Sequence, residues 1–221
     1  MKEAEQLIKE YVRRNNKEYK ENLTYKDCVE DMSKIDLQSI TEQDVDQVMK
    51  RFLIEWGRMQ RVLGEERAPQ WENKAANQIR ANSQKLNDFK MKDLSNVELS
   101  NFESDIKDFF ESFKKALGGT WVGAAKVLHL ICPNFFPPWD NNIIRAISEE
   151  IKRKYEIKLK VEKSSGEDYY RFMQEIQDFI RKHEGLLSDL AREHKKSKVK
   201  IVDDFLWYAT TRPLFIWFRR E

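Results

Sequence analysis

The sequence is poor in the residues that build metal sites, disulfide frameworks and tight turns. It holds two cysteines, Cys28 and Cys132, which lie far apart and form no CxxC pair. This usage argues against a zinc site, an iron–sulfur cluster and a disulfide framework, and it predicts two buried thiols in a reducing cytoplasm. We expect no metal and no cofactor. Seven glycines and five prolines are too few for a β protein with many turns.

Long apolar runs are also missing. No run reaches the ~20 residues that a transmembrane helix needs, and the first residues, Met-Lys-Glu-Ala-Glu-Gln, do not resemble a signal peptide. Charged residues make up 35% of the chain and apolar residues 40%. This balance is typical of a globular protein with a well-solvated surface, so the sequence predicts a soluble cytoplasmic protein without membrane contact.

A strong excess of charge of one sign is absent as well. The net charge is +2, which by itself does not indicate a nucleic-acid partner. Basic residues do cluster, within 152–154, within 158–163 and at Lys195, Lys196, Lys198 and Lys200. Such clusters can hold phosphates, but they more often form solvated faces or loops, and we interpret them in that way.

Helical periodicity dominates what is present. Between residues 105 and 117 the apolar side chains recur at helical spacing and form one stripe, at Ile106, Phe109, Phe110, Phe113 and Leu117. Ser100 or Asn101 is expected to cap this helix, and Gly118-Gly119 to end it. The stretch 42–63 has the same pattern, and Thr41 with Asp44 predicts a capping box at its start.

The same pattern predicts further helices at about 3–19, 71–89, 121–131, 140–156, 167–183 and 199–211. Residues 156–164 alternate like a strand but have no evident partner, so we expect an extended connection there. The sequence therefore predicts an all-α fold, with residues 1–40 as a charged helical appendage and residues 41–221 as one compact helical domain. The apolar C-terminal end is expected to pack back on the core, or else to form the contact of a weak dimer.

The most informative segment runs from residue 117 to residue 147. Gly118-Gly119 separates two helices, and Thr120 is placed to cap the second one. Gly123 falls in the first turn of that helix, where backbone N–H groups without a covering side chain suit a phosphate. The alternative is close helix packing at Gly123, and taken alone the packing interpretation is favoured.

A proline-bearing loop follows this helix and leads to Asp140. The chain reads Cys-Pro-Asn-Phe-Phe-Pro-Pro-Trp over residues 132–139, and two consecutive prolines stiffen its path. Asp140 then precedes an apolar run, as an N-cap residue does, and a cap of this kind contributes ~1 kcal/mol relative to alanine. An isolated aspartate in this position is most simply a cap.

The order of these features resembles the helix-hairpin-helix DNA glycosylases. A glycine turn, a small-residue helix with a lysine, a short proline loop and then Asp-x-x-aliphatic-x-Arg occur in sequence here. Asp140 and Arg145 match the last motif, Gly119 and Gly123 approximate the hairpin glycines, and Lys126 lies one residue after the position of the family's lysine. The hairpin reads Leu-Gly-Gly-Thr-Trp-Val-Gly where the family has Leu-Pro-Gly-Val-Gly.

A closer resemblance, over residues 45–150, is to a group of uncharacterised bacterial and archaeal proteins. They share a Lys-x-Leu-His helix, a Pro-x-x-Phe-Pro loop and a Trp-Asp pair, which here are residues 126–129, 133–137 and 139–140. This group carries no established activity. The resemblance therefore bears on the fold and on the site, while the function rests on the glycosylase likeness.

The glycosylase resemblance implies a helix-hairpin-helix DNA glycosylase-like fold and a set of site residues. Asp140 would be the catalytic carboxylate and Lys126, if burial lowers its pKa, an amine nucleophile. Gly119 and Gly123 would bind DNA phosphate. The remaining candidates would contact the substrate, namely Trp139, Trp121, His129, Asn141 and Arg145. The aromatic candidates and His129 are also explained by core packing, and for Phe136 packing is the favoured interpretation.

Three functional hypotheses remain open from the sequence. The first is a DNA-binding repair enzyme that excises a damaged base with Asp140 as its carboxylate. The second is a non-catalytic helical module that binds nucleic acid or protein. The third is an interaction protein without a nucleic-acid role, which the small net charge favours.

Overall fold

The computed structural model describes residues 2–18, 21–61, 63, 68–140 and 165–211. These residues are helical and contain no strand, which confirms the predicted all-α class. The α-helices are α1 (Lys2–Glu18), α2 (Glu21–Lys34), α3 (Glu42–Asp44), α4 (Trp71–Ala81), α5 (Ser83–Lys90), α6 (Glu103–Ala116), α7 (Trp121–Ile131), α10 (Gly166–Lys182), α11 (Glu184–His194) and α12 (Lys198–Thr211). Two π-helical segments, η1 (Val45–Lys50) and η2 (Phe52–Trp56), follow α3, and two 3-10 helices, η3 (Leu94–Asn96) and η4 (Leu99–Phe102), precede α6.

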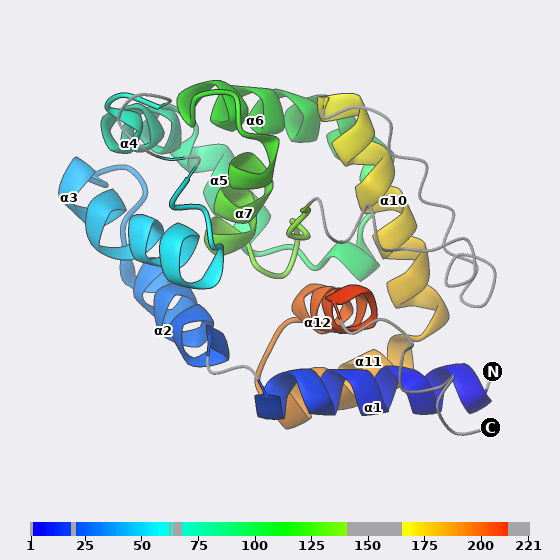
Figure 1. Ribbon diagram of the computed structural model, residues 1–221. Helices are drawn as coiled ribbons and strands as arrows, with labels where there is room; N and C mark the ends of the chain where they lie inside the picture. Colours follow the sequence, from blue (N-terminus) through cyan, green and yellow to red (C-terminus); the bar gives the residue numbers. More distant parts are fainter. Residues whose placement is uncertain (1, 19–20, 62, 64–67, 141–164, 212–221) are drawn as a thin grey trace.

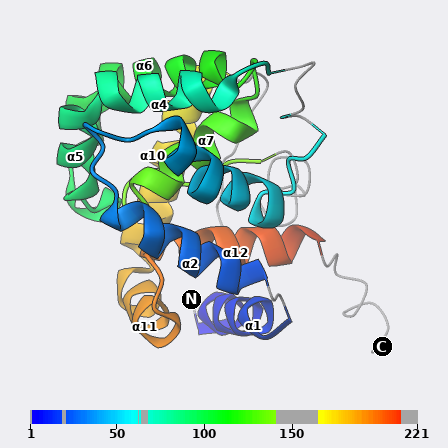
Figure 2. The same cartoon turned by 90° about the vertical axis from the view of Figure 1, so that its left-hand side faces the viewer.

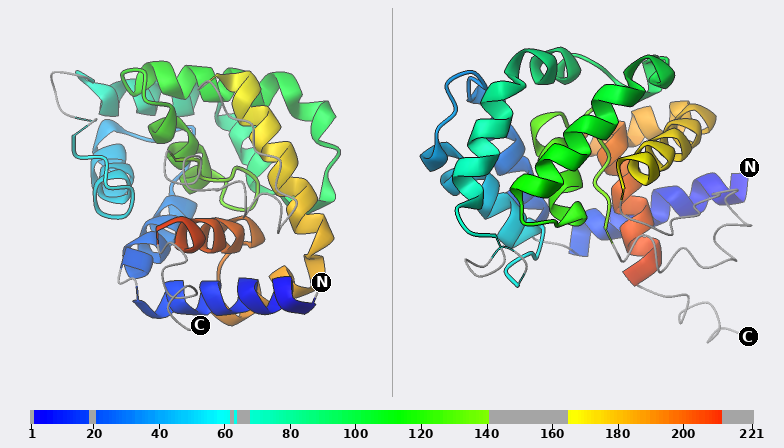
Figure 3. Two further views of the ribbon diagram at one scale, coloured as in Figure 1. Left: turned by 45° about the vertical axis from the view of Figure 1, so that its right-hand side comes forward. Right: turned by 90° about the horizontal axis from the view of Figure 1, so that it is seen from above.

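The helices form two layers joined along their sides. In Figure 1, α4 to α7 make the upper layer, while α1, α11 and α12 make the lower one. Helix α10 packs on α6 at one end and on α11 and α12 at the other, and α2 with η2 closes the opposite side (Figure 2). The left view of Figure 3 shows the same layers, and both views place α12 next to α1. The face of α12 opposite α1 therefore looks toward the upper layer.

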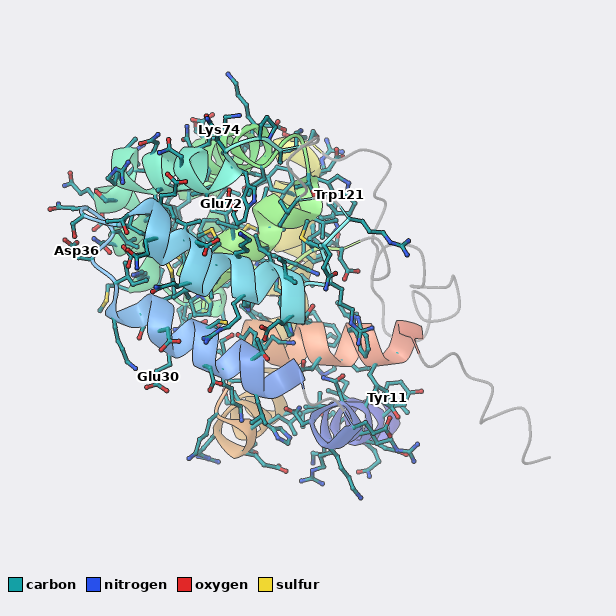
Figure 4. The ribbon with its side chains drawn as sticks, turned by 60° about the vertical axis from the view of Figure 1, so that its left-hand side comes forward. Tyr11, Glu30, Asp36, Glu72, Lys74 and Trp121 are labelled. Carbon is teal, nitrogen blue, oxygen red and sulfur yellow. The ribbon has the colours of Figure 1, made fainter. Side chains whose placement is uncertain are left out.

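Helix α1 belongs to the core of this arrangement. Its apolar residues Leu7, Ile8 and Val12 are buried in the same hydrophobic cluster as the rest of the chain. Tyr11, labelled in Figure 4, lies between α1 and α12 with its ring 5.3 Å from that of Tyr208. The sequence predicts an appendage at residues 1–40 because charged residues dominate there. The buried stripe on α1 instead supplies one wall of the core beneath α12.

The helix predicted at 42–63 begins as expected but ends early. Thr41 and Asp44 form the predicted capping box, in which each backbone N–H donates to the other side chain. The end at residue 63 is wrong, because the helical segment stops at Trp56. The N–H of Gly57 donates to the Phe52 carbonyl at 2.9 Å, an i to i−5 bond, and the chain then turns sharply at Arg58, whose φ is 54°.

The helix predicted at 71–89 is likewise two helices. Asn82 separates α4 from α5, with φ −116° and ψ 13°. Its side-chain amide donates to the Gln78 carbonyl at 2.9 Å. Asparagine often competes with the helix in this way because its short side chain can bond to nearby backbone groups.

Helices α6 and α7 are the two helices predicted on either side of the glycine turn. The five apolar residues of the α6 stripe are all buried, but neither Ser100 nor Asn101 caps this helix, because both lie within η4. Gly118 and Gly119 take φ values of 68° and 88° and end α6, with the Gly119 N–H donating to the Lys114 carbonyl at 2.8 Å. Thr120 caps α7 as predicted, since its hydroxyl accepts from the Gly123 N–H at 3.2 Å.

The other predicted elements divide into two groups. Helices near 3–19, 121–131, 167–183 and 199–211 are confirmed to within two residues at either end. The expected helix at 140–156, the extended connection at 156–164 and the chain beyond 211 lie outside the described residues.

Candidate functional site

Lys126 and Asp140, the two residues proposed to be catalytic, come together in the fold. Lys126 lies in the middle of α7, and Asp140 ends the proline-bearing loop that follows it. The Lys126 Nζ is 3.8 Å from Asp140 Oδ2 and donates to the Gly57 carbonyl at 3.0 Å. Its side chain is 9% exposed and that of Asp140 is 16% exposed. The amine is therefore held between the turn after η2 and the loop, with limited access to solvent.

The environment of Lys126 favours the loss of its proton. Burial lowers the pKa of the Lys126 amine, and the nearby negative charges of Asp140 and Asp203 oppose this shift to a smaller extent. The Trp56 ring lies 5.2 Å from Nζ, within the range of a cation–π contact. A lysine with a depressed pKa beside a carboxylate can act as a nucleophile or in proton transfer.

His129, one turn after Lys126, is fixed in the core. Its Nδ1 lies 2.7 Å from the Phe136 carbonyl and its Nε2 lies 2.9 Å from the Tyr25 hydroxyl. A carbonyl can only accept, so Nδ1 carries the proton and Nε2 accepts from Tyr25. Burial lowers the pKa of His129 to about 3. Both ring nitrogens are used inside the protein, as the packing interpretation predicts.

We expect folding to become pH-dependent through His129. The folded chain keeps the ring neutral down to a pKa of about 3, whereas the ordinary value is 6.5. Between these values the unfolded chain binds the extra proton, so the free energy of unfolding falls as the pH falls. From pH 6.5 to pH 5 this loss is about 2 kcal/mol.

Denaturant unfolding across this pH range measures the effect, and nitrogen NMR of the ring measures its charge directly. The control is His129→Gln, whose unfolding free energy should depend less steeply on pH over the same interval. A His129 ring that protonates near pH 6.5 in the folded protein contradicts the expectation.

Trp139 and Phe136, from the loop, are also buried completely. The Trp139 ring lies 4.6 Å from that of Trp121 and stacks at 5.5 Å on Phe172 of α10. Trp121 is only partly buried, and Figure 4 shows it at the start of α7. Phe136 is confirmed as a core residue. Of the two tryptophans proposed to stack on a base, Trp121 alone has an exposed surface.

The amides proposed to bind phosphate already have partners. The Gly119 N–H donates to the Lys114 carbonyl, and the Gly123 N–H donates to Thr120. A Cβ on Gly123 would lie 2.7 Å from Thr120 Cγ2 and 3.2 Å from Met59 Cε, so close packing explains this glycine. Phosphate binding by these two amides would require them to leave these bonds.

Two further candidates cannot be placed. Asn141 and Arg145, together with the basic residues 152–154 and 158–163, lie outside the described residues. Cys28 and Cys132 are free and buried, which confirms the expected buried thiols.

The basic cluster at 195–200 was interpreted as a solvated face, and this is wrong for two of its lysines. Lys196 and Lys200 have side chains that are 0% and 3% exposed. Lys196 pairs with Asp204 at 2.6 Å, and Lys200 pairs with Asp203 at 2.6 Å and also with Asp204. Lys200, Asp203 and Asp204 lie on the face of α12 that looks into the molecule, and Lys196 joins them from the segment before the helix.

A signal for this cluster was present in the sequence. Asp203 and Asp204 lie three and four residues after Lys200 on α12 and therefore share one helical face with it, whereas Lys196 precedes the helix. Apolar residues lie between these charged residues along α12, so no face of the helix is wholly polar. We name Lys196, Lys200, Asp203 and Asp204 the α12 ionic cluster.

A separate hollow of about 770 Å³ lies between α3–η1 and α4. Glu42, Asp46 and Glu72 give it an acidic lining, and Lys50 pairs with Asp46 at 2.6 Å and with Glu72 at 3.3 Å. Glu72 is labelled in Figure 4. The hollow shares no lining residue with the Lys126–Asp140 site.

Comparison with known proteins adds no family to this picture. No protein-family model matches the chain, and no curated protein and no solved structure matches it significantly. Within the described ranges, no three His, Cys, Asp or Glu side chains gather in a way that suits a metal ion. None of the helices described is long and apolar enough to cross a membrane. The site must therefore be interpreted from its own geometry.

Proposed function

We propose that the chain is a DNA N-glycosylase of the helix-hairpin-helix type, with Lys126 and Asp140 as its catalytic pair. The observation that carries this proposal is the buried contact of 3.8 Å between the Lys126 amine and the Asp140 carboxylate. The sequence resemblance assigns the carboxylate to Asp140 and, with an offset of one residue, the nucleophile to Lys126. The lowered pKa of Lys126 supports the proposal, because only the unprotonated amine can attack.

The reaction uses both groups at the sugar carbon C1′. The bond from C1′ to the base breaks and its electron pair leaves with the base, which takes up a proton. Asp140 stabilises the positive charge that grows on the sugar. The Lys126 nitrogen forms a new bond to C1′ and gives up a proton, for which Asp140 is an acceptor within reach. The C1′–O4′ bond then breaks, O4′ takes up a proton, and the remaining amine proton is lost, which gives an imine between Lys126 and the open-chain sugar.

Trapping of this imine tests the proposal. The full chain is incubated with a DNA duplex that contains one abasic site, whose aldehyde at C1′ accepts an amine directly. Borohydride then reduces any imine to a stable cross-link, and the modified lysine is identified by mass spectrometry. We expect a cross-link at Lys126 that Lys126→Gln abolishes and that Asp140→Asn slows by a factor of about 100 or more.

Lys90 provides a matched control. It is a half-buried lysine on α5, and burial lowers its pKa as it does for Lys126. Lys90→Gln should leave the cross-link unchanged if Lys126 is the nucleophile. A cross-link that survives Lys126→Gln, or a well-folded chain that forms none, overturns the catalytic proposal.

A second function, a non-catalytic module that binds nucleic acid or protein, is favoured by one observation. The Lys126 ammonium is enclosed by the Gly57 carbonyl, Trp56 and Asp140, as a structural ion pair would be. On this alternative Asp140→Asn lowers the melting temperature, while binding of the partner persists. If the partner is DNA, its affinity falls steeply with salt.

A further inference from the structure

The α12 ionic cluster places four charged groups where α12 faces the core. The side chains of Asp203 and Asp204 are 8% and 1% exposed, and those of Lys196 and Lys200 are 0% and 3% exposed. Asn16 of α1 adds a hydrogen bond to Asp204 at 3.3 Å. Four charges are thus removed from water and neutralise one another within the fold.

Stability alone does not explain such a cluster. Removing charged groups from water is costly, and well-packed apolar residues of similar volume are often equally stabilising or more so. The neighbouring positions of α12, such as Val199, Val202 and Phe205, are apolar and buried. Charge at Lys196, Lys200, Asp203 and Asp204 therefore calls for a reason beyond packing.

The α12 ionic cluster and the Lys126–Asp140 site both contact the ring of Trp56. The Lys200 Nζ lies 5.0 Å from the Trp56 ring and 5.1 Å from the Tyr25 ring. The Lys126 Nζ lies 5.2 Å from the same tryptophan. One indole thus contacts a lysine from α7 and a lysine from α12, and the two amines cannot be more than about 10 Å apart.

We propose that Lys200 and Asp203 are positioning residues that set the fraction of Lys126 carrying a proton. This role rests on the proposed use of Lys126 as a nucleophile. Lys200 acts as a fixed positive charge that favours the neutral amine, and Asp203 acts as a fixed negative charge that favours the ammonium. The two are held 2.6 Å apart by their own ion pair, so their positions relative to Lys126 are rigid.

The charged groups with the largest effect on Lys126 come from the elements around it. Asp140 of the loop and Asp203 of α12 raise the pKa of the Lys126 amine, whereas Lys200 of α12 and Arg58 of the turn after η2 lower it. Burial, the largest effect, also lowers it. The nearby ring of His129 is neutral, since its own pKa is about 3. Lys200 and Asp203 are thus the charged groups of α12 that shift the pKa of Lys126.

Competitive labelling tests the proposal without DNA. The full chain is acetylated with limiting acetic anhydride over a range of pH, and mass spectrometry gives the reactivity and hence the pKa of each lysine. At about 10 Å or less, one charge should shift the pKa of Lys126 by at least about one pH unit. We expect Lys200→Gln to raise this pKa and Asp203→Asn to lower it.

Lys198 on the same helix is the matched control. It pairs with Glu184 at 2.7 Å and with Asp93 at 3.2 Å, and it is not among the groups with the largest effect on the pKa of Lys126. Lys198→Gln should leave the pKa of Lys126 unchanged. A merely structural role for Lys200 and Asp203 would not produce shifts of opposite sign, because both substitutions break the same ion pair.

The double variant Lys200→Gln/Asp203→Asn covers the case in which a single variant does not fold. It removes one charge of each sign and should return the pKa of Lys126 close to that of the unsubstituted chain. Shifts in one direction for both single variants, or none in any variant that folds, overturn the positioning role. Opposite shifts without a cross-link to abasic DNA would support it and reject the glycosylase proposal alone.

Discussion

Replacing Asp204 by asparagine is expected to lower the free energy of unfolding by about 3–5 kcal/mol, since it leaves the buried Lys196 ammonium without its counter-charge and leaves Lys200 with Asp203 alone. Asp204 accepts from Lys196 at 2.6 Å and also from Lys200. Its side chain is 1% exposed. The two lysines lower the pKa of Asp204 against the effect of burial, so the carboxylate is ionised at neutral pH and its charge is what the substitution removes. Denaturant unfolding at pH 7 measures the loss.

Asp189→Asn provides a control with the same chemical change. Asp189 pairs with Arg192 at 2.6 Å on α11, but the two side chains are 71% and 81% exposed. An exposed pair of this kind contributes less than about 1 kcal/mol, so we expect little change. Equal losses for Asp189→Asn and Asp204→Asn would show that burial of the α12 ionic cluster does not govern its energetics.

Replacing Trp139 by alanine is expected to cost about 3–5 kcal/mol of unfolding free energy. The side chain is completely buried, and its ring packs against Trp121, Phe110, Tyr169 and Phe172. These partners come from α6, α7 and α10, so the cavity left by alanine opens where three helices meet. The rigid surroundings can close such a cavity only in part.

Trp139→Phe separates packing from hydrogen bonding. Within the part of the chain that the structure describes, the Trp139 Nε1 has no hydrogen-bond partner. Phenylalanine removes this unsatisfied donor and keeps much of the ring volume, so it should cost clearly less than alanine. The partly buried Trp121 gives a second comparison, since Trp121→Ala leaves a smaller cavity. A Trp139→Ala chain as stable as the unsubstituted protein would contradict the packing role.

Trp139 and Asp204 both support the position of the Lys126–Asp140 pair. Trp139 directly precedes Asp140, so the packing of its ring fixes where the carboxylate leaves the core. Asp204 holds the two lysines of the α12 ionic cluster, one of which contacts Trp56 beside Lys126. Loss of either residue should therefore disturb the proposed catalytic pair through its surroundings.

Helices α2 and α11 were not predicted from the sequence, because few apolar residues recur in them at helical spacing. Helix α2 buries Tyr25, Cys28 and Met32 on one face, but its other residues are mostly charged or polar. Helix α11 buries Leu187 and Leu190 and follows α10 after a single residue, His183. Short helices like these draw their stability mainly from tertiary packing, which a local pattern does not contain.

Local rules determined much of the rest. The α6 stripe, the glycine turn, the Thr120 cap and the capping box at Thr41 each depend on residues within one or two turns of one another. Such interactions can be predicted from spacing alone because both partners belong to the same short segment. The all-helical class follows from them.

The tertiary structure decided where the charged residues lie. Spacing places Lys200 and Asp204 on one helical face but does not say whether that face is solvated. Lys196 and Lys200 were therefore predicted at the surface, whereas the packing of α12 against α1, α10 and α11 buries them. The approach of Lys126 to the Gly57 carbonyl joins segments separated by many residues, and no local pattern records it. By itself the sequence determined most of the helices and named the Lys126–Asp140 pair. The pair is buried, and the charged groups of α12 act on it, only because helices that are distant in the sequence pack together and exclude water.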